Sequence, residues 1–153
     1  MKKIIFLLAA AAIFAATGCD SDDAGKDPGN ILGNGTYVGT VTVTTPAFEK
    51  DDVEVKVTFA DDRKTAKIEM FKVKFAETMP VTLDIKIPGV TAKEVSGSDG
   101  MSLSGENIIP LVGTNPYPLY TITGLTGTVT ASELTLSMTM GAFPTTYSGT
   151  AEE

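Results

Sequence analysis

Apolar and polar residues alternate along most of the chain after residue 34, which is the pattern of half-buried antiparallel strands. Between Tyr37 and Val43 the odd positions carry tyrosine, glycine and valine, and threonine fills most even positions. The stretch 52–60 has valine or phenylalanine at every odd position from 53 to 59. Charged residues occupy 61–64, so we expect the strands on either side of them to form a hairpin.

The run 65–75 changes phase in its middle. Ile68 and Met70 are apolar at even positions, whereas Phe71, Val73 and Phe75 are apolar at odd positions. A β-bulge near Met70 and Phe71 would keep both sets on one face, because it inserts one unpaired residue. Similar patterns predict the remaining strands at 81–87, 90–95, 101–104, 119–130, 134–140 and 147–151.

Glycines inside the predicted strands favour a barrel. They mark sharp bends or places where two backbones approach closely, and they are Gly39, Gly124, Gly127 and Gly149. After the amino-terminal segment no stretch has a helical period of apolar residues, and prolines are expected between the strands. The predicted fold is all-β: a small antiparallel up-and-down β-barrel of about eight strands, with a β-sandwich as the alternative.

Residues 105–118 interrupt the strand pattern with three prolines, so we expect a loop with an extended piece at 108–111. The segment 108–120, which overlaps this region, is apolar. It is expected to form a lid over a barrel mouth, to offer a docking surface for a partner, or to pack on the barrel end.

The amino terminus has a different pattern. Lys2 and Lys3 precede an apolar run, Ile4–Ala16, whose 13 residues are too few to span a membrane as a helix, which takes about 20. The run ends at Ala16-Thr17-Gly18-Cys19, which resembles the lipobox of bacterial lipoproteins, with Ala16 where that family prefers leucine. Cys19 is the single cysteine of the chain and so has no partner for an internal disulfide.

This resemblance implies that residues 1–18 are a signal peptide cleaved before Cys19 and that Cys19 carries diacylglycerol, with a further acyl chain such as palmitate on the new amino group. Two or three acyl chains anchor firmly, at about 0.8 kcal/mol per buried methylene. Residues 19–33 then form a lipidated, flexible tether of roughly 20 Å, and residues 34–153 form the barrel domain.

The acidic stretch Asp20-Ser21-Asp22-Asp23 is similar to a surface-export signal of one Gram-negative lineage. It implies an outer-membrane protein that is lipid-anchored and displayed on the cell surface. The alternative is an acidic tether that leaves the domain on the periplasmic face.

Several segments of the predicted barrel are similar to those of a known family: Gly35–Val43, Phe75–Val81, Ile87–Val90, Gly127–Thr130, Leu134–Leu136 and Tyr147–Thr150. Together they resemble the calycin-like β-barrel domain of lipoproteins from Gram-negative gut bacteria, over residues 34–151. The resemblance implies an eight-stranded barrel related in shape to lipocalins. It implies no particular activity, because a shared barrel does not mean a shared ligand.

Composition narrows the function further. The chain of 153 residues has a net charge of −7, and loss of Lys2 and Lys3 changes this to −9. Such a charge argues against binding to nucleic acid or electrostatic docking to anionic lipid. The chain has no histidine, which excludes His-dependent catalytic triads and disfavours zinc. We therefore expect no enzymatic activity, no cofactor and no metal.

The remaining ionisable candidates are carboxylates beside lysines, and we expect them to form charge pairs on a solvated face. They are Glu69, Glu77, Asp84 and Glu94.

A set of aromatic and methionine residues is expected either to line a ligand cavity or to fill the core, because a barrel of eight strands permits both. The set is Tyr37, Phe59, Met70, Phe71, Phe75, Met138, Met140 and Tyr147. The leading hypothesis is an anchored barrel that binds a small apolar or glycan ligand or a partner protein. The alternative is an accessory subunit of a cell-surface complex with a filled barrel and no ligand.

Overall fold

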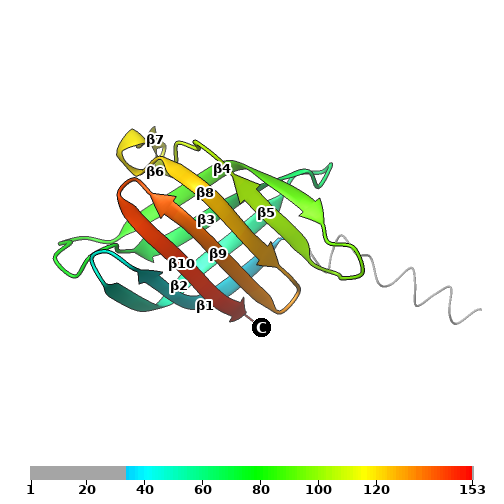
Figure 1. Cartoon of the computed structure of the whole chain (residues 1–153), viewed down its shortest axis with the longest axis horizontal. Helices are drawn as coiled ribbons and strands as arrows, with labels where there is room; N and C mark the ends of the chain where they lie inside the picture. Colours follow the sequence, from blue (N-terminus) through cyan, green and yellow to red (C-terminus); the bar gives the residue numbers. More distant parts are fainter. Residues whose placement is uncertain (1–33, 153) are drawn as a thin grey trace, which may run out of the picture. The chain divides into compact units, whose positions relative to one another are not determined.

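A computed structural model describes residues 34–152, and these residues form a closed antiparallel β-barrel (Figure 1). Eight strands build the wall: β1 (Gly35–Val43), β2 (Phe48–Phe59), β3 (Thr65–Val73), β4 (Leu83–Glu94), β5 (Met101–Gly105), β8 (Ile122–Val129), β9 (Glu133–Met140) and β10 (Phe143–Ala151). Each pairs with the next, and β10 pairs with β1 to close the ring. The expected up-and-down barrel is confirmed and the sandwich alternative is excluded.

A short hairpin completes the wall beside β4. Strand β5 pairs with β4 only from Thr91 to Glu94, and β6 (Leu111–Val112) covers β4 at Ile85 and Lys86 instead. β6 turns back into β7 (Asn115–Pro116), and the 3-10 helix η2 (Pro118–Tyr120) follows. Residues 34–152 contain no helix that is long and apolar enough to span a membrane.

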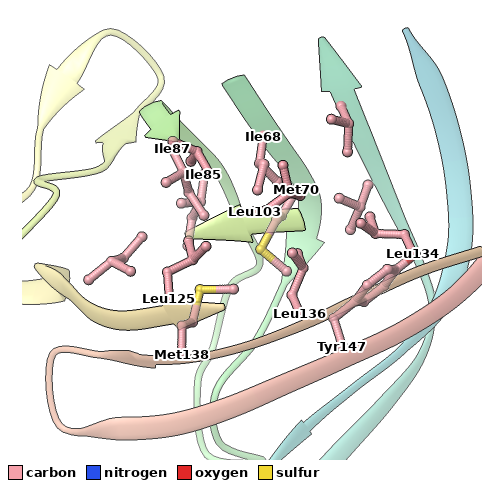
Figure 2. Packing of buried hydrophobic residues seen from close by; sticks show 14 of the residues in the cluster. Ile68, Met70, Ile85, Ile87, Leu103, Leu125, Leu134, Leu136, Met138 and Tyr147 are labelled. Carbon is pink, nitrogen blue, oxygen red and sulfur yellow. The ribbon is translucent and has the colours of Figure 1, made fainter. Parts of the chain in front are cut away.

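The alternating apolar and polar positions of the strands face the interior and the exterior of the barrel, respectively. Valine, leucine, isoleucine and methionine side chains from seven wall strands, together with Tyr147 of β10, are buried in one continuous core. Figure 2 shows such side chains from β3, β4, β5, β8, β9 and β10 pointing into the same interior. Except for the buried Thr145, the threonines and serines between them face outward, so burial of the apolar positions drives closure of the sheet.

Four bulges bend the described strands. At each bulge two residues oppose one on the neighbouring strand, namely 51–52 in β2, 71–72 in β3, 88–89 in β4 and 124–125 in β8. One residue of each pair has a positive φ: Asp52 (57°), Lys72 (56°), Gly89 (67°) and Gly124 (60°). The bulge expected near Met70 and Phe71 is therefore present, and it increases the local bend of β3.

Glycine allows β1 and β10 to approach closely. Gly39 lies opposite Gly149, and a Cβ on Gly39 would overlap the carbonyl oxygen of Ser148. A Cβ on Gly127 would likewise overlap the carbonyl oxygen of Thr135 in β9. These contacts, with the positive φ of Gly124, match the bends and close approaches expected from glycine in these strands.

The strand predictions fail where bulges and long-range pairing decide the outcome. The expected strands 81–87 and 90–95 are one strand, β4, because Pro88 lies at a bulge and so need not donate to a ladder. Val81 lies outside it and is 57% exposed. β10 begins at Phe143 rather than 147, and it contains Pro144, so prolines do not all lie between strands.

The barrel has two different ends. Asn34 and Glu152 lie at one of them, where the backbone N–H of Glu152 donates to the carbonyl oxygen of Thr36 at 2.9 Å; we call it the tether end. The opposite end is formed by loops 74–82 and 106–121 and by turns 44–47 and 141–142, on the left of Figure 1. We call it the aromatic end, for the side chains described next.

Candidate functional site

Four aromatic rings gather at the aromatic end. Phe75 is fully buried at the top of the core, and Tyr120 and Phe143 pack on it with ring centroids 5.1 and 5.6 Å away. Tyr117 packs on Tyr120 at 5.1 Å and is 38% exposed. The cluster therefore runs from the core to the surface and closes this end with apolar rings, and such ring pairs add stability beyond the area they bury.

The loop that supplies two of these rings is held at several points. The Glu106 carboxylate accepts a hydrogen bond from the N–H of Gly124 at 2.6 Å, and Ile108 pairs with Ile122 through two backbone hydrogen bonds. The N–H of Tyr117 donates to the carbonyl oxygen of Pro110 at 2.8 Å. Pairing of β6 with β4 fixes the far side of the loop. The segment is thus an ordered cover built into the wall.

The same end exposes large apolar side chains. Four are exposed in residues 34–152, and all four belong to loops 74–82 and 106–121: Val81 (57%), Ile109 (46%), Tyr117 (38%) and Leu119 (71%). Single exposed hydrophobic residues are ordinary, but their restriction to one end of a small barrel is not. This restriction makes the aromatic end the candidate site.

Charge is nearly absent there. The loops and turns that form this end contain three charged residues, Lys74, Glu77 and Glu106, and the Glu106 carboxylate is already hydrogen-bonded to the N–H of Gly124. Burial, and then the neighbouring Tyr117, raises the pKa of Tyr120 above its ordinary value of 10.0, so this phenol is neutral at physiological pH. The chemistry available at this end is apolar contact plus hydroxyl hydrogen bonding.

Six of the eight residues expected to line a cavity or fill the core are buried in the barrel interior, and they are Tyr37, Met70, Phe75, Met138, Met140 and Tyr147. The two tyrosines reach across to the backbone: the Tyr37 hydroxyl donates to the carbonyl oxygen of Thr130 at 2.6 Å, and that of Tyr147 to Val53 at 3.1 Å. Burial raises the pKa of both phenols. These side chains form part of the packed core.

The other two residues of that set lie elsewhere. Phe59 is half-buried at the tether end, where the Arg63 guanidinium lies 5.3 Å from its ring centroid. Phe71 is half-buried on the outer wall and lines an external hollow between β1, β2 and β3. Sequence alternation placed Phe71 inside with Val73, whereas the bulge at 71–72 turns only Val73 inward.

The carboxylates mostly occupy a solvated face. Glu69 forms a salt bridge with Lys67 at 3.0 Å and approaches Lys86, its cross-strand neighbour, at 3.9 Å. Asp84 accepts a hydrogen bond from the N–H of Lys72 at 2.9 Å. Within residues 34–152, no three His, Cys, Asp or Glu side chains are grouped so that they could hold a metal ion. Cys19 and the tether 19–33 lie outside the described residues.

Sequence reasoning missed one member of the ring cluster. Phe143 was not among the candidates, and Tyr117 and Tyr120 were included only as part of the apolar segment 108–120. The signal in the sequence was that uncharged, proline-rich segment. Nothing in the local pattern shows that Phe75, 45 positions earlier than Tyr120, is the ring on which the segment packs.

Comparison with known proteins supports the barrel. The chain matches no protein-family model, and no curated protein matches it. It is similar to the crystal structure of a proposed outer membrane protein from Bacteroides fragilis NCTC 9343, with 22% identity and a TM-score of 0.54. The match covers 82% of this chain and 52% of that chain, so this chain spans about half of that protein's length. At this identity the likeness shows a shared fold.

Proposed function

We propose that this chain is a surface lipoprotein of the outer membrane, anchored by acyl chains on Cys19, and that its barrel is a non-enzymatic accessory module that docks a partner protein through the aromatic end. The observation that carries the docking proposal is the restriction of Val81, Ile109, Tyr117 and Leu119 to the end opposite Asn34. Residues 19–33 join the barrel at Asn34, so the proposed tether does not enter through the aromatic end.

The evidence for the lipid anchor comes from the sequence. The positively charged start, the 13-residue apolar run and the small residues before a lone Cys19 together support lipidation. The acidic stretch after Cys19 supports display on the outer surface. The closed eight-strand meander fits the calycin-like lipoprotein family, and the fold shared with the Bacteroides fragilis protein is consistent with this placement.

The filled interior favours docking over an internal ligand. A small-molecule cavity takes roughly 300–1,000 Å³ of space lined by side chains. Here Met70, Met138 and Leu125 point into the barrel interior from three different strands and belong to one continuous core (Figure 2). The rings of Phe75, Tyr120 and Phe143 close the aromatic end above them.

The partner should have an apolar, uncharged patch. Charged residues on a partner would lose hydration against residues 107–121 without gaining an opposite charge. A protein surface suits this end better than a bilayer, because the acidic chain repels anionic lipid and the segment carries no basic residue.

Metabolic labelling tests the anchor. In cells given radioactive palmitate, the wild-type chain should carry label and sediment with membranes, and Cys19→Ser should lose both. Protease added to intact cells should digest the wild-type domain if it is displayed on the surface. Label or membrane association retained by Cys19→Ser would overturn the anchor, and complete protection from protease would place the domain on the periplasmic face.

Site-specific photocrosslinking tests the docking. A benzophenone amino acid at Leu119 should give one discrete protein adduct in the native host, because this side chain is 71% exposed at the aromatic end. The same probe at the exposed Thr128 on the barrel wall is the matched control, and Ile109→Asp should abolish the Leu119 adduct. No protein adduct at Leu119, or the same adduct from Thr128, would contradict the proposal.

A further inference from the structure

We propose that the outer wall of the barrel carries a second, independent site, a shallow hollow that binds the ring of a neutral sugar. The hollow has a volume of about 300 Å³ and is lined by Val38, Asp52, Glu54, Phe71 and Lys72. This volume lies at the lower limit of ligand pockets and fits a single ring rather than an extended ligand.

The fold opens this hollow between β2 and β3. Their ladder ends at the pair Val55 and Met70, and beyond it each strand contains a bulge. The bulge residues Asp52 and Lys72 both have left-handed backbones, with φ of 57° and 56°, and both line the hollow. Non-glycine residues with a left-handed backbone are strained, and such residues cluster at functional sites. Here two bulges place one such residue each at the same hollow.

Phe71 gives the hollow an apolar surface. The bulge sends Met70 and Val73 inward and leaves the Phe71 ring half-buried on the outer wall, outside the core cluster. Part of this ring therefore remains in contact with solvent. Next to Val38, it offers a flat apolar face of the kind that packs on the C–H face of a sugar ring.

The polar groups around Phe71 select a neutral ligand. Asp52 and Glu54 accept hydrogen bonds, and the Lys72 ammonium donates them. Within the described residues no hydrogen bond or ion pair engages these three side chains, so they are open to a ligand. A cation would meet Lys72 and an anion would meet the two carboxylates, whereas sugar hydroxyls both donate and accept.

An array of immobilised neutral and charged oligosaccharides, probed with the full-length chain, tests the site. The wild type should bind at least one neutral glycan. Phe71→Ala should weaken that binding at least tenfold, Phe71→Tyr should keep it, and Glu54→Gln should weaken it. The matched control Leu119→Ala, at the aromatic end, should leave it unchanged.

Folding and sugar binding can be separated, because Phe71 lies outside the core and the midpoint of thermal unfolding of Phe71→Ala should stay close to that of the wild type. The proposal is overturned if no neutral glycan binds the wild type, if only charged glycans bind, or if a folded Phe71→Ala binds as well as the wild type.

Discussion

Two tyrosines show how single residues shape the interior. Tyr37 and Tyr147 lie inside the barrel next to Gly35 and Gly149, and a Cβ on either glycine would overlap the neighbouring tyrosine ring. The absent side chains make room for the rings, and each hydroxyl then reaches a backbone carbonyl on a distant strand or turn. A buried phenol is tolerated in such a core because its one donor is satisfied.

Tyr147→Phe should therefore destabilise the barrel by about 1–3 kcal/mol, because the carbonyl oxygen of Val53 would lose the hydroxyl that donates to it. Urea unfolding followed by circular dichroism measures the free energy of unfolding. Tyr117→Phe, at an exposed ring, is the matched control and should change stability by less than about 0.5 kcal/mol. Equal stabilities of wild type and Tyr147→Phe would show that this hydrogen bond contributes nothing.

The buried tyrosines predict that the barrel loses stability at alkaline pH. Burial raises the pKa of Tyr37, Tyr120 and Tyr147 above the ordinary value of 10.0, so the folded state holds these protons more tightly than the unfolded state. The contribution of these phenols to the free energy of unfolding is therefore fully present below pH 10. It falls as the pH rises above 10, since unfolding then releases protons. Tyrosinate absorbance should appear at higher pH in the folded chain than in urea, and coincident titrations would refute the burial argument.

At the scale of elements, the paired glycines Gly39 and Gly149 allow strands β1 and β10 to lie close together. Gly39→Ala should destabilise the barrel by about 1–3 kcal/mol, because its Cβ would meet the backbone of β10 at Ser148 and Gly149. Thr146→Ala, exposed on the outer face of β10, is the control and should leave stability nearly unchanged. If thermal unfolding gives the same midpoint for Gly39→Ala as for Thr146→Ala, the two strands do not need this close approach.

One of the contacts that hold the loop 106–121 at the aromatic end is made by a carboxylate, Glu106. Glu106→Ala should lower stability by about 1 kcal/mol, because the N–H of Gly124 at the β8 bulge would lose its acceptor. Hydrogen exchange at Gly124 should accelerate, and Glu106→Gln should restore part of the protection. Glu133→Ala, at an exposed strand end, is the control. Unchanged exchange at Gly124 in Glu106→Ala would count against this anchoring role.

Strands whose alternation is local were predictable from sequence, and bulges were not. The faces of β1, β2 and β9 and the turn at 61–64 follow directly from the residues, because one buried face enforces a period of two. The outward position of Phe71 and the continuity of β4 through Pro88 depend on which strands close the ring. That choice is made by pairing between distant segments, so a local pattern does not contain it.

For the whole molecule, sequence predicted a barrel, and structure shows a barrel whose inward side chains form one continuous buried core. The alternating residues predicted a closed barrel. The methionine and aromatic residues of the candidate set, however, were compatible with either a hollow or a packed interior. Because Met70, Phe75 and Met138 pack into one core, both proposed binding surfaces lie outside it, at the aromatic end and at the hollow lined by Phe71. Both lie in parts of the fold where loops or bulges interrupt the regular wall.

Native mass spectrometry of the full-length chain purified from its own host, in a mild detergent, tests the central claim most directly. An acylated accessory barrel with a packed interior predicts the mass of the polypeptide from Cys19 onward plus its acyl chains, with no small molecule that is still retained by Phe71→Ala. A mass without acyl chains would contradict the anchor. A small molecule retained equally by the wild type, Phe71→Ala and Leu119→Asp would place a ligand inside the barrel and contradict the filled core.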